Sequence, residues 1–220
     1  MNHFQLVWFD LSRGLPTALG VMKDVLGWGT TVRVMRHFLW RKLTSKPFRE
    51  LHRAGELSPG ERFTRHQLLP VLILDDIFRE VLEMEDEMLS SILGRIVGST
   101  GAKFIAHAAG DPRPEDWQVM SGAEKRDLAN RSLLRFLNAE ASVVDAEPAS
   151  FAFDVSRCHF VSLCGELGRP GLASLFCQAD AVLFGDERFG VELRREQTLA
   201  SGGSACTFRF HWEDNPKIEP

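Results

Sequence analysis

Three of the four cysteines in the chain lie in one short stretch, RCHFVSLCGELGRPGLASLFCQAD, which runs from Arg157 to Asp180. A cysteine thiolate is a nucleophile and a metal ligand, and a carboxylate such as Glu166 or Asp180 can act as a general acid or base. The alternative is packing, because a free cysteine behaves as a small hydrophobic residue. Residue types alone leave both interpretations open.

Helical spacing limits which of these groups can share a surface. At about 100° per residue, Cys158 and Cys164 point roughly 120° apart, whereas Cys158 and Glu166 lie about 80° apart and can share a face. Cys177 and Asp180 are three residues apart, which makes them neighbours on a helix. A nearby carboxylate raises the pKa of a thiol, so Cys177 needs a positive partner or a base to act as a nucleophile.

A predicted strand downstream offers that positive partner. In FGVELRREQTL, Arg195 falls on the same, mostly apolar side as Val191 and Leu193, so its guanidinium needs a carboxylate or an anionic ligand. An internal salt bridge is the competing interpretation. In the next predicted strand, SACTFRFHW, Cys206 shares its side with three aromatic residues, where plain core packing is the alternative.

A metal site is a third interpretation of the cysteines. Zinc sites favour close pairs such as Cys-x-x-Cys, and the four cysteines of this chain are spaced much more widely. Cys158, Cys177 and Cys206 can still converge in space to hold a metal. The sequence has no Gly-rich phosphate loop, no G-x-S-x-G elbow and no H-E-x-x-H motif, so no other cofactor is expected.

Composition narrows the class of protein. A net charge of -4 argues against a nucleic-acid binder, and the basic cluster over 33–53 is interpreted as a solvated helix face. No apolar run reaches the roughly 18 residues of a membrane span, and the N-terminus lacks the pattern of a secretory signal. We therefore expect a cytoplasmic protein with reduced cysteines and no membrane partner. A homo-oligomer is permitted.

The N-terminal part, residues 1–148, is predicted to be mainly helical. Residues 1–20 are expected to form an irregular or strand-like lead-in, followed by a helix over 21–46 that is interrupted near Gly27 and Gly29. Further helices are predicted between Thr64 and Val97 and over Ser121–Ala141, after a loop at LSPGERF. Pro70 is placed near the start of a helix. The acidic face of the second region is interpreted as solvated surface: Asp75, Asp76, Glu80, Glu83, Glu85, Asp86 and Glu87.

After residue 148, the spacing of the apolar residues changes from the three-to-four-residue period of a helix to the two-residue period of a strand. The pattern predicts first a strand over Phe151–Val155 and then two helices, over Arg157–Leu167 and Gly171–Ala179. Two strands follow, over 189–199 and 204–212, joined by a turn of four to five residues. The last residues, 214–220, are predicted to form a tail. The chain, 1–220, is therefore expected to form one α+β domain. In it, the helical N-terminal part packs with a C-terminal antiparallel sheet and two short helices, which belong to a region at 149–213.

The segments FDVSRCHFVSLCGELGRPGLASLFCQAD and LRREQTLASGGSACTFRF resemble the signature of the L-2-amino-thiazoline-4-carboxylic acid hydrolase family. That signature has R-C after a strand, E-L-G closing the next helix, then C-x-x-D, R-x-x-T and a glycine before a C-x-F-R strand. The matching residues are Arg157, Cys158, Glu166, Leu167, Gly168, Cys177, Asp180, Arg195, Thr198, Gly203, Cys206, Phe208 and Arg209. The chain departs from it at Glu196, where the family tends to have Thr, and at Thr207, where it has an acidic residue.

The resemblance implies hydrolytic opening of a 2-amino-thiazoline ring that bears a carboxylate, giving a carbamoyl-cysteine. Such a reaction needs a nucleophile or activated water, an acid for the departing ring atom, and a cation for the carboxylate. The implied candidates are Cys177, Cys158 or Cys206 as nucleophile or metal ligand, Asp180 or Glu166 as acid or base, Arg195 as the carboxylate clamp, and Thr198 as a further substrate-binding residue.

Two functions from other classes compete with the hydrolase. One is a non-catalytic small-molecule or metal-binding domain, similar to ligand-binding domains of the vinyl-reductase type, in which the cysteines line or staple a cavity. The other is a structural partner protein that uses the acidic helix. Thiol reactivity combined with metal analysis separates a nucleophile from a metal site, because a low-pKa thiolate reacts faster than a buried structural thiol.

Overall fold

The chain begins with helices, so the expectation of an irregular or strand-like lead-in over 1–20 is wrong. The computed structural model describes residues 3–49, 51, 56–145, 147 and 149–212, and the predicted tail at 214–220 lies outside them. Helix α1 (His3–Phe9) continues through a π-helical turn (Asp10–Gly14) into α2 (Leu15–Thr44). The start of α2 tolerates Pro16 because the first N–H groups of a helix have no intrahelical partner.

Helix α2 changes direction at Gly27, as predicted. This glycine has a φ of 74°, a left-handed conformation that side chains disfavour, and Thr31 donates a hydrogen bond of 2.8 Å to its carbonyl oxygen. The helix ends at Thr44, before Pro47, also as predicted.

The predicted loop at LSPGERF is instead the start of α3 (Pro59–Glu80). Ser58 is the N-cap, and its hydroxyl accepts a hydrogen bond of 3.1 Å from the backbone N–H of Glu61. Pro59, not Pro70, occupies the tolerant first turn, and Pro70 lies inside the helix. The position of Pro59 was misjudged because Ser-Pro-Gly is typical of a turn as well as of a helix start. A helix that starts after this segment would have Pro70 near its beginning, so the error at Pro59 led to the error at Pro70.

Two predicted regions end differently in the structure. Helix α4 (Asp86–Ala108) runs beyond Val97, and α5 (Pro114–Val119) follows it. Helix α6 (Gly122–Leu133) begins with a capping box formed by Ser121 and Glu124. The prediction of a helix to Ala141 is wrong at its C-terminal end, because β1 (Ala139–Asp145) starts there.

The C-terminal region forms a four-stranded antiparallel sheet in the order β1-β2-β4-β3. Its other strands are β2 (Ser150–Cys158), β3 (Val191–Arg194) and β4 (Cys206–Trp212), so three of the four were predicted. The connection between β3 and β4 is longer than the predicted turn and spans 195–205, including a 3₁₀ turn over Leu199–Ser201. The Thr207 hydroxyl accepts hydrogen bonds from the backbone N–H groups of Glu196 and Gln197, at 3.2 and 3.4 Å, and so anchors the connection.

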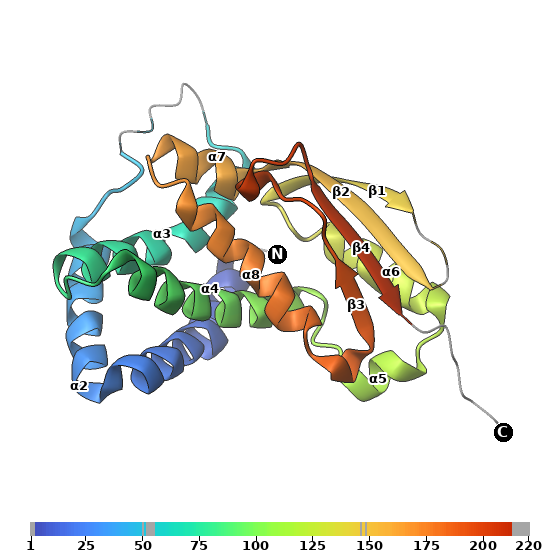
Figure 1. Ribbon diagram of the computed structural model, residues 1–220, viewed down its shortest axis with the longest axis horizontal. Helices are drawn as coiled ribbons and strands as arrows, with labels where there is room; N and C mark the ends of the chain where they lie inside the picture. Colours follow the sequence, from blue (N-terminus) through green and yellow to red (C-terminus); the bar gives the residue numbers. More distant parts are fainter. Residues whose placement is uncertain (1–2, 50, 52–55, 146, 148, 213–220) are drawn as a thin grey trace.

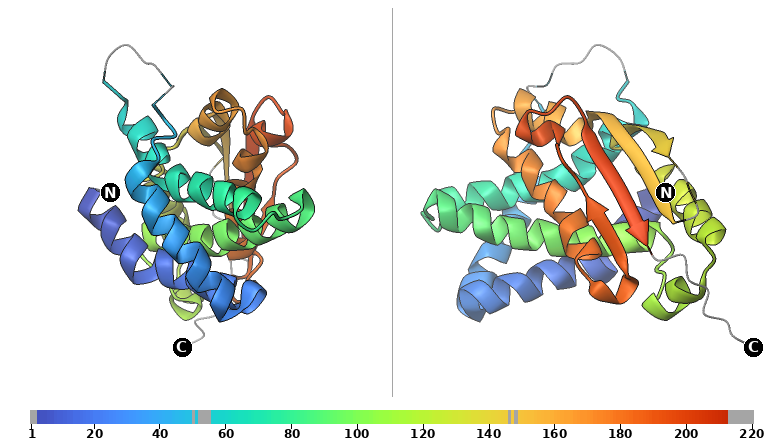
Figure 2. Two further views of the ribbon diagram at one scale, coloured as in Figure 1. Left: turned by 90° about the vertical axis from the view of Figure 1, so that its left-hand side faces the viewer. Right: turned by 45° about the vertical axis from the view of Figure 1, so that its right-hand side comes forward.

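Two short helices link the strands to the helical part, which gives the predicted α+β fold. Helix α7 (His159–Glu166) follows β2, and α8 (Gly171–Phe184) packs along α4. Figure 1 and Figure 2 show α8 between the bundle of α2, α3 and α4 and the sheet. The main core joins these helices through buried side chains: Val34, Ile73, Phe78, Leu93, Leu163 and Leu175. No helix in the described part of the chain is long and apolar enough to cross a membrane.

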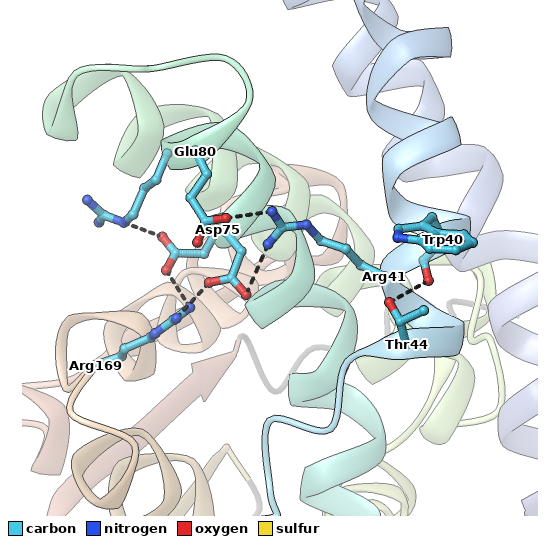
Figure 3. Close-up of polar contacts among 8 residues, drawn as sticks. Trp40, Arg41, Thr44, Asp75, Glu80 and Arg169 are labelled. Carbon is cyan, nitrogen blue, oxygen red and sulfur yellow. Dashed lines mark hydrogen bonds and ion pairs between the residues drawn. The ribbon is translucent and has the colours of Figure 1, made fainter.

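The acidic face between Thr64 and Val97 is not uniformly solvated, because Asp75 on α3 is only 2% exposed. Its carboxylate accepts hydrogen bonds from Arg79 at 3.0 Å and from Arg169 at 2.9 Å. Arg169 also pairs with Asp76 at 2.6 Å. Figure 3 shows how these contacts, extended by Arg41 of α2, tie together α2, α3 and the loop between α7 and α8. The network is structural and lies outside the cavity described below.

Candidate functional site

A cavity of about 300 Å³ lies between one face of the sheet and helices α4, α6 and α8. Alternation along the strands directs Phe153 of β2 and Phe208 and Phe210 of β4 into it, while Asp154 and Arg209 lie on the opposite face. Its volume is at the lower end of the roughly 300–1,000 Å³ typical of small-molecule sites. The cavity walls are mostly aromatic and aliphatic.

The cavity gathers five of the seven residues singled out from the sequence. Cys158 is the last residue of β2, and Cys206 is the first residue of β4 and pairs with Val155. Helix α8 contributes Cys177 and Asp180, which its turn places side by side. These four residues and Arg195 line one end of the cavity, which we call the polar end.

Asp180 and Arg195 form an ion pair at this polar end. Arg195 Nη1 donates a hydrogen bond of 2.8 Å to Asp180 Oδ2, and Nη2 donates one of 3.0 Å to the carbonyl oxygen of Cys177. The guanidinium also lies over the Phe208 ring, 5.3 Å from its centroid. Both side chains are largely buried, with exposures of 18% for Arg195 and 20% for Asp180. No other charged residue of the described chain lines the cavity. The internal salt bridge considered from the sequence is therefore present.

The environment of Asp180 makes it an acid–base group near neutral pH. Burial raises the pKa of Asp180 to about 6, while the charge and hydrogen bond of Arg195 lower it and limit the rise. A carboxyl group with this pKa populates both protonation states close to neutrality. General acid–base catalysis requires that property.

Two thiols at the polar end, those of Cys177 and Cys158, are protonated at neutral pH. Burial raises the pKa of Cys177 to about 11, although the charge of Arg195 opposes the rise. Burial also raises the pKa of Cys158, against hydrogen bonds from the backbone N–H groups of Phe160 and Val161 at the start of α7. The thiols of Cys177 and Cys158 are thus poor nucleophiles in the resting protein. The Cys206 sulfur accepts a hydrogen bond of 3.2 Å from the backbone N–H of Leu199.

Glu166 and Thr198 do not line the cavity. Glu166 is exposed at the end of α7, and it shares no helix face with Cys158, because Cys158 belongs to β2 and α7 begins at His159. Thr198 caps the 3₁₀ turn, where its hydroxyl accepts a hydrogen bond of 3.1 Å from the backbone N–H of Ser201. Cys164 lies in the helical core, where burial raises its pKa to about 12.

Two cavity residues carried no signal in the sequence. Trp117 of α5 and Asn138, just before β1, both line the cavity. The Nε1 atom of Trp117 and the Oδ1 atom of Asn138 are buried and have no hydrogen-bond partner in the described part of the chain. Neither residue has a motif or spacing that relates it to the cysteines, since α5 and β1 are brought to the cavity by tertiary packing.

The metal interpretation gains no support from the side-chain positions. Within the described residues, no three His, Cys, Asp or Glu side chains are grouped so that they could hold a metal ion. Cys158, Cys177 and Cys206 share the cavity wall without forming such a group.

Comparison with known families agrees with the geometry. The family described as L-2-amino-thiazoline-4-carboxylic acid hydrolase matches residues 62–210. The chain belongs to this family. No curated protein and no solved structure matches the chain. The family match runs from α3 to β4, so it includes all five residues of the polar end and also helices whose sequence carried no recognised motif. The name of the hydrolase family indicates a hydrolytic activity.

Proposed function

We propose that the chain is a hydrolase that opens a 2-amino-thiazoline-4-carboxylate-like ring to a carbamoyl-cysteine. The observation that carries the proposal is the pairing of Asp180 with Arg195 at 2.8 Å inside an otherwise apolar cavity. An acid–base group and a cation are two of the three elements that this reaction needs. Membership of the hydrolase family supports the same reaction class.

The chemistry assigned to Asp180 is activation of water. Ionised Asp180 takes a proton from a water molecule, whose oxygen bonds to the amidine-like C2 carbon of the ring. The tetrahedral adduct passes its hydroxyl proton to the ring nitrogen, the bond from C2 to the ring sulfur breaks, and C2 becomes the carbonyl carbon of a carbamoyl group. The sulfur leaves with the bonding electrons and receives the proton that Asp180 took from the water, so Asp180 is ionised again and one water is added overall.

The protonated thiol of Cys177 is the proposed hydrogen-bond donor to the departing sulfur, and it keeps its own proton because its pKa lies above that of an ordinary thiol. It lies one helical turn from Asp180 and stays protonated at neutral pH because burial raises its pKa to about 11. For Cys177 to act as the nucleophile instead, it would first have to transfer its proton to Asp180. The large difference between the pKa values of the two groups opposes that transfer. We therefore favour water as the attacking group.

Arg195 is the proposed clamp for the substrate carboxylate. A guanidinium carries five N–H donors, and the contacts with Asp180 and the Cys177 carbonyl use only part of this set. The donors left over can bind a carboxylate while the pair with Asp180 persists. Arg195 would then hold the ring beside the group that activates water.

The test is turnover of L-2-amino-thiazoline-4-carboxylic acid by the purified protein in ¹⁸O-labelled water. We expect carbamoyl-cysteine with one labelled oxygen in the carbamoyl group, detected by mass spectrometry. Arg195→Lys is expected to raise KM roughly tenfold or more, because a lysine lacks the forked donor geometry. Arg209→Lys is the matched control, since Arg209 pairs with Asp154 at 2.7 Å on the other face of the sheet. Failure of the wild-type protein to open the ring would refute the proposal.

A non-catalytic ligand-binding function is the second candidate. It is favoured by the apolar cavity wall and by thiols whose pKa values are raised by burial. On this alternative the same thiazoline acid, or another small acid, binds to Arg195 and is released unchanged. Binding in calorimetry without carbamoyl-cysteine formation would select it.

A further inference from the structure

The cavity is longer than a thiazoline ring requires. Both Cys206 and Trp212, the first and last residues of β4, line it. A strand rises about 3.3 Å per residue, so these two positions are about 20 Å apart. The polar end lies beside Cys206, and the opposite end, which we call the aromatic end, is formed by Trp117, Phe151 and Trp212.

The wall between the two ends is apolar. Phe153 and Phe208 stack with centroids 4.6 Å apart, and Phe184 of α8 meets Phe210 edge to face at 4.8 Å. A ring that carries one amino group and one carboxylate places its polar groups at the polar end. It leaves this aromatic surface uncovered, although burying apolar surface is the main source of affinity in such a site.

The aromatic end contains a packed pair of indoles. Trp117 packs edge to face against Trp212 at 5.7 Å and is 9% exposed. Its Nε1 atom is buried out of reach of the cavity, so Trp117 offers a ligand an apolar surface and no hydrogen-bond donor. A long ligand therefore gains affinity at this end by covering aromatic surface.

We propose that the natural substrate is an elongated amphiphile rather than a bare thiazoline acid. Its acidic head binds Arg195 at the polar end, and an aryl or alkyl body covers Phe153, Phe208 and Phe210 on the way to the aromatic end. For this small-molecule substrate, the assignment of the head as a cyclic amidine rests on the proposed function. The apolar body rests on the cavity alone.

Calorimetry with two carboxylic acids tests the proposal without turnover. The probes are hexanoate and 6-phenylhexanoate. We expect Kd to fall roughly tenfold or more when the phenyl group is added, because it buries apolar area.

A variant then locates the apolar body. Phe210→Ala is expected to remove most of the advantage of 6-phenylhexanoate over hexanoate, because it deletes part of the aromatic wall of the cavity. Phe4→Ala is the matched control, because Phe4 is 75% exposed on α1 and does not line the cavity. The comparison of the two acids in the wild-type protein needs no variant, so a folding defect in Phe210→Ala would not obscure the result.

The outcomes separate this inference from the proposed function. Equal affinity for hexanoate and 6-phenylhexanoate would overturn the apolar body. An equal phenyl advantage in the wild-type protein and Phe210→Ala would overturn the placement of the body against β4. Tight binding of the long acids by a protein that fails to open the thiazoline ring would support the inference and refute the hydrolase. Ring opening by a protein without affinity for any long acid would support the hydrolase and refute the inference.

Discussion

Asp180 Oδ2 lies 2.8 Å from Arg195 Nη1, so one ion pair joins α8 to the segment that follows β3. Two opposing effects meet in this pair. Burial raises the pKa of Asp180, and the positive charge of Arg195 lowers it, which leaves the carboxyl group with a pKa of about 6. The remaining walls of the cavity are nearly free of charge. Acid–base behaviour near neutral pH therefore depends on the balance within this one pair.

Replacing Asp180 with Asn is expected to lower kcat for ring opening roughly 100-fold or more, which is the usual contribution of a general base. In the wild-type protein, kcat/KM should rise with pH through about 6 as Asp180 ionises, and the variant should lack this limb. Initial rates between about pH 4.5 and 8 measure both effects.

Asp154→Asn is the matched control for that experiment. Asp154 makes a comparable ion pair with Arg209, but on the face of the sheet that lies away from the cavity. The rate and the pH limb should both survive this change. If Asp180→Asn keeps the wild-type limb, another group titrates and Asp180 is not the base.

Cys177→Ala is expected to slow ring opening by roughly 10- to 100-fold, and Cys177→Ser by less, because a hydroxyl group can still donate a hydrogen bond to the departing sulfur. A nucleophilic cysteine would behave differently: the serine variant would be nearly inactive, and a covalent adduct would form. Rate measurements together with intact-protein mass spectrometry distinguish these roles. An adduct on Cys177 during turnover would contradict the water mechanism.

Alkylation of Cys177 by iodoacetamide is expected to be slow at pH 7 and to accelerate as the pH approaches 11. The physical reason is that the thiolate reacts, and burial keeps the thiol protonated. Peptide mapping after timed alkylation reports the rate at each cysteine. Rapid modification of Cys177 at neutral pH would show that its thiolate is stabilised in a way the structure does not contain.

Asp180 should also make the stability of the protein depend on pH. Its pKa is about 6 in the folded state against the ordinary 3.8, so between these values the folded state holds a proton that the unfolded state has lost. The free energy of unfolding therefore falls as pH rises through this window. Relative to Asp180→Asn, the wild-type protein should lose at most about 1.4 kcal/mol per pH unit. Urea titrations at several pH values within the window test this, and parallel curves for the two proteins would contradict it.

Asp75→Ala is expected to reduce the free energy of unfolding by about 1–3 kcal/mol, because it leaves Arg79 and Arg169 without their buried partner. Glu80→Ala is the control, since Glu80 is 61% exposed and should contribute about 1 kcal/mol or less. Urea denaturation of both variants measures the difference. Equal losses of unfolding free energy in the two variants would show that the burial of Asp75 adds no stability.

Strands with regular alternation could be predicted from the sequence, and β1 could not. Phe151, Phe153 and Val155 recur at every second position because one face of β2 covers the cavity. The sequence of β1, AEASVVD, lacks that pattern because most of this edge strand is exposed. The N-terminal helix was missed for a similar reason: Leu6 and Phe9 pack against residues far away in the sequence, among them Phe104.

The candidate site was predictable where chemistry marks the residues. Cysteines, a carboxylate and an inward-facing arginine can be recognised by type, and the structure brings Cys158, Cys177, Asp180, Arg195 and Cys206 to one cavity. Trp117 and Asn138 are marked only by their burial without a partner, which is a property of the folded protein. Burial likewise determines the pKa of Asp180, and the burial of a side chain cannot be derived from the spacing of residues in the sequence.

Strand β4 carries residues of the polar end at its start and of the aromatic end at its finish. The ion pair of Asp180 and Arg195 comes from α8 and the residue after β3. If the proposed function holds, substitutions at Phe210 or Trp212 are expected to change which tail lengths are accepted while the groups proposed to react keep their places. We expect members of the family to have diverged in substrate choice mainly along this strand.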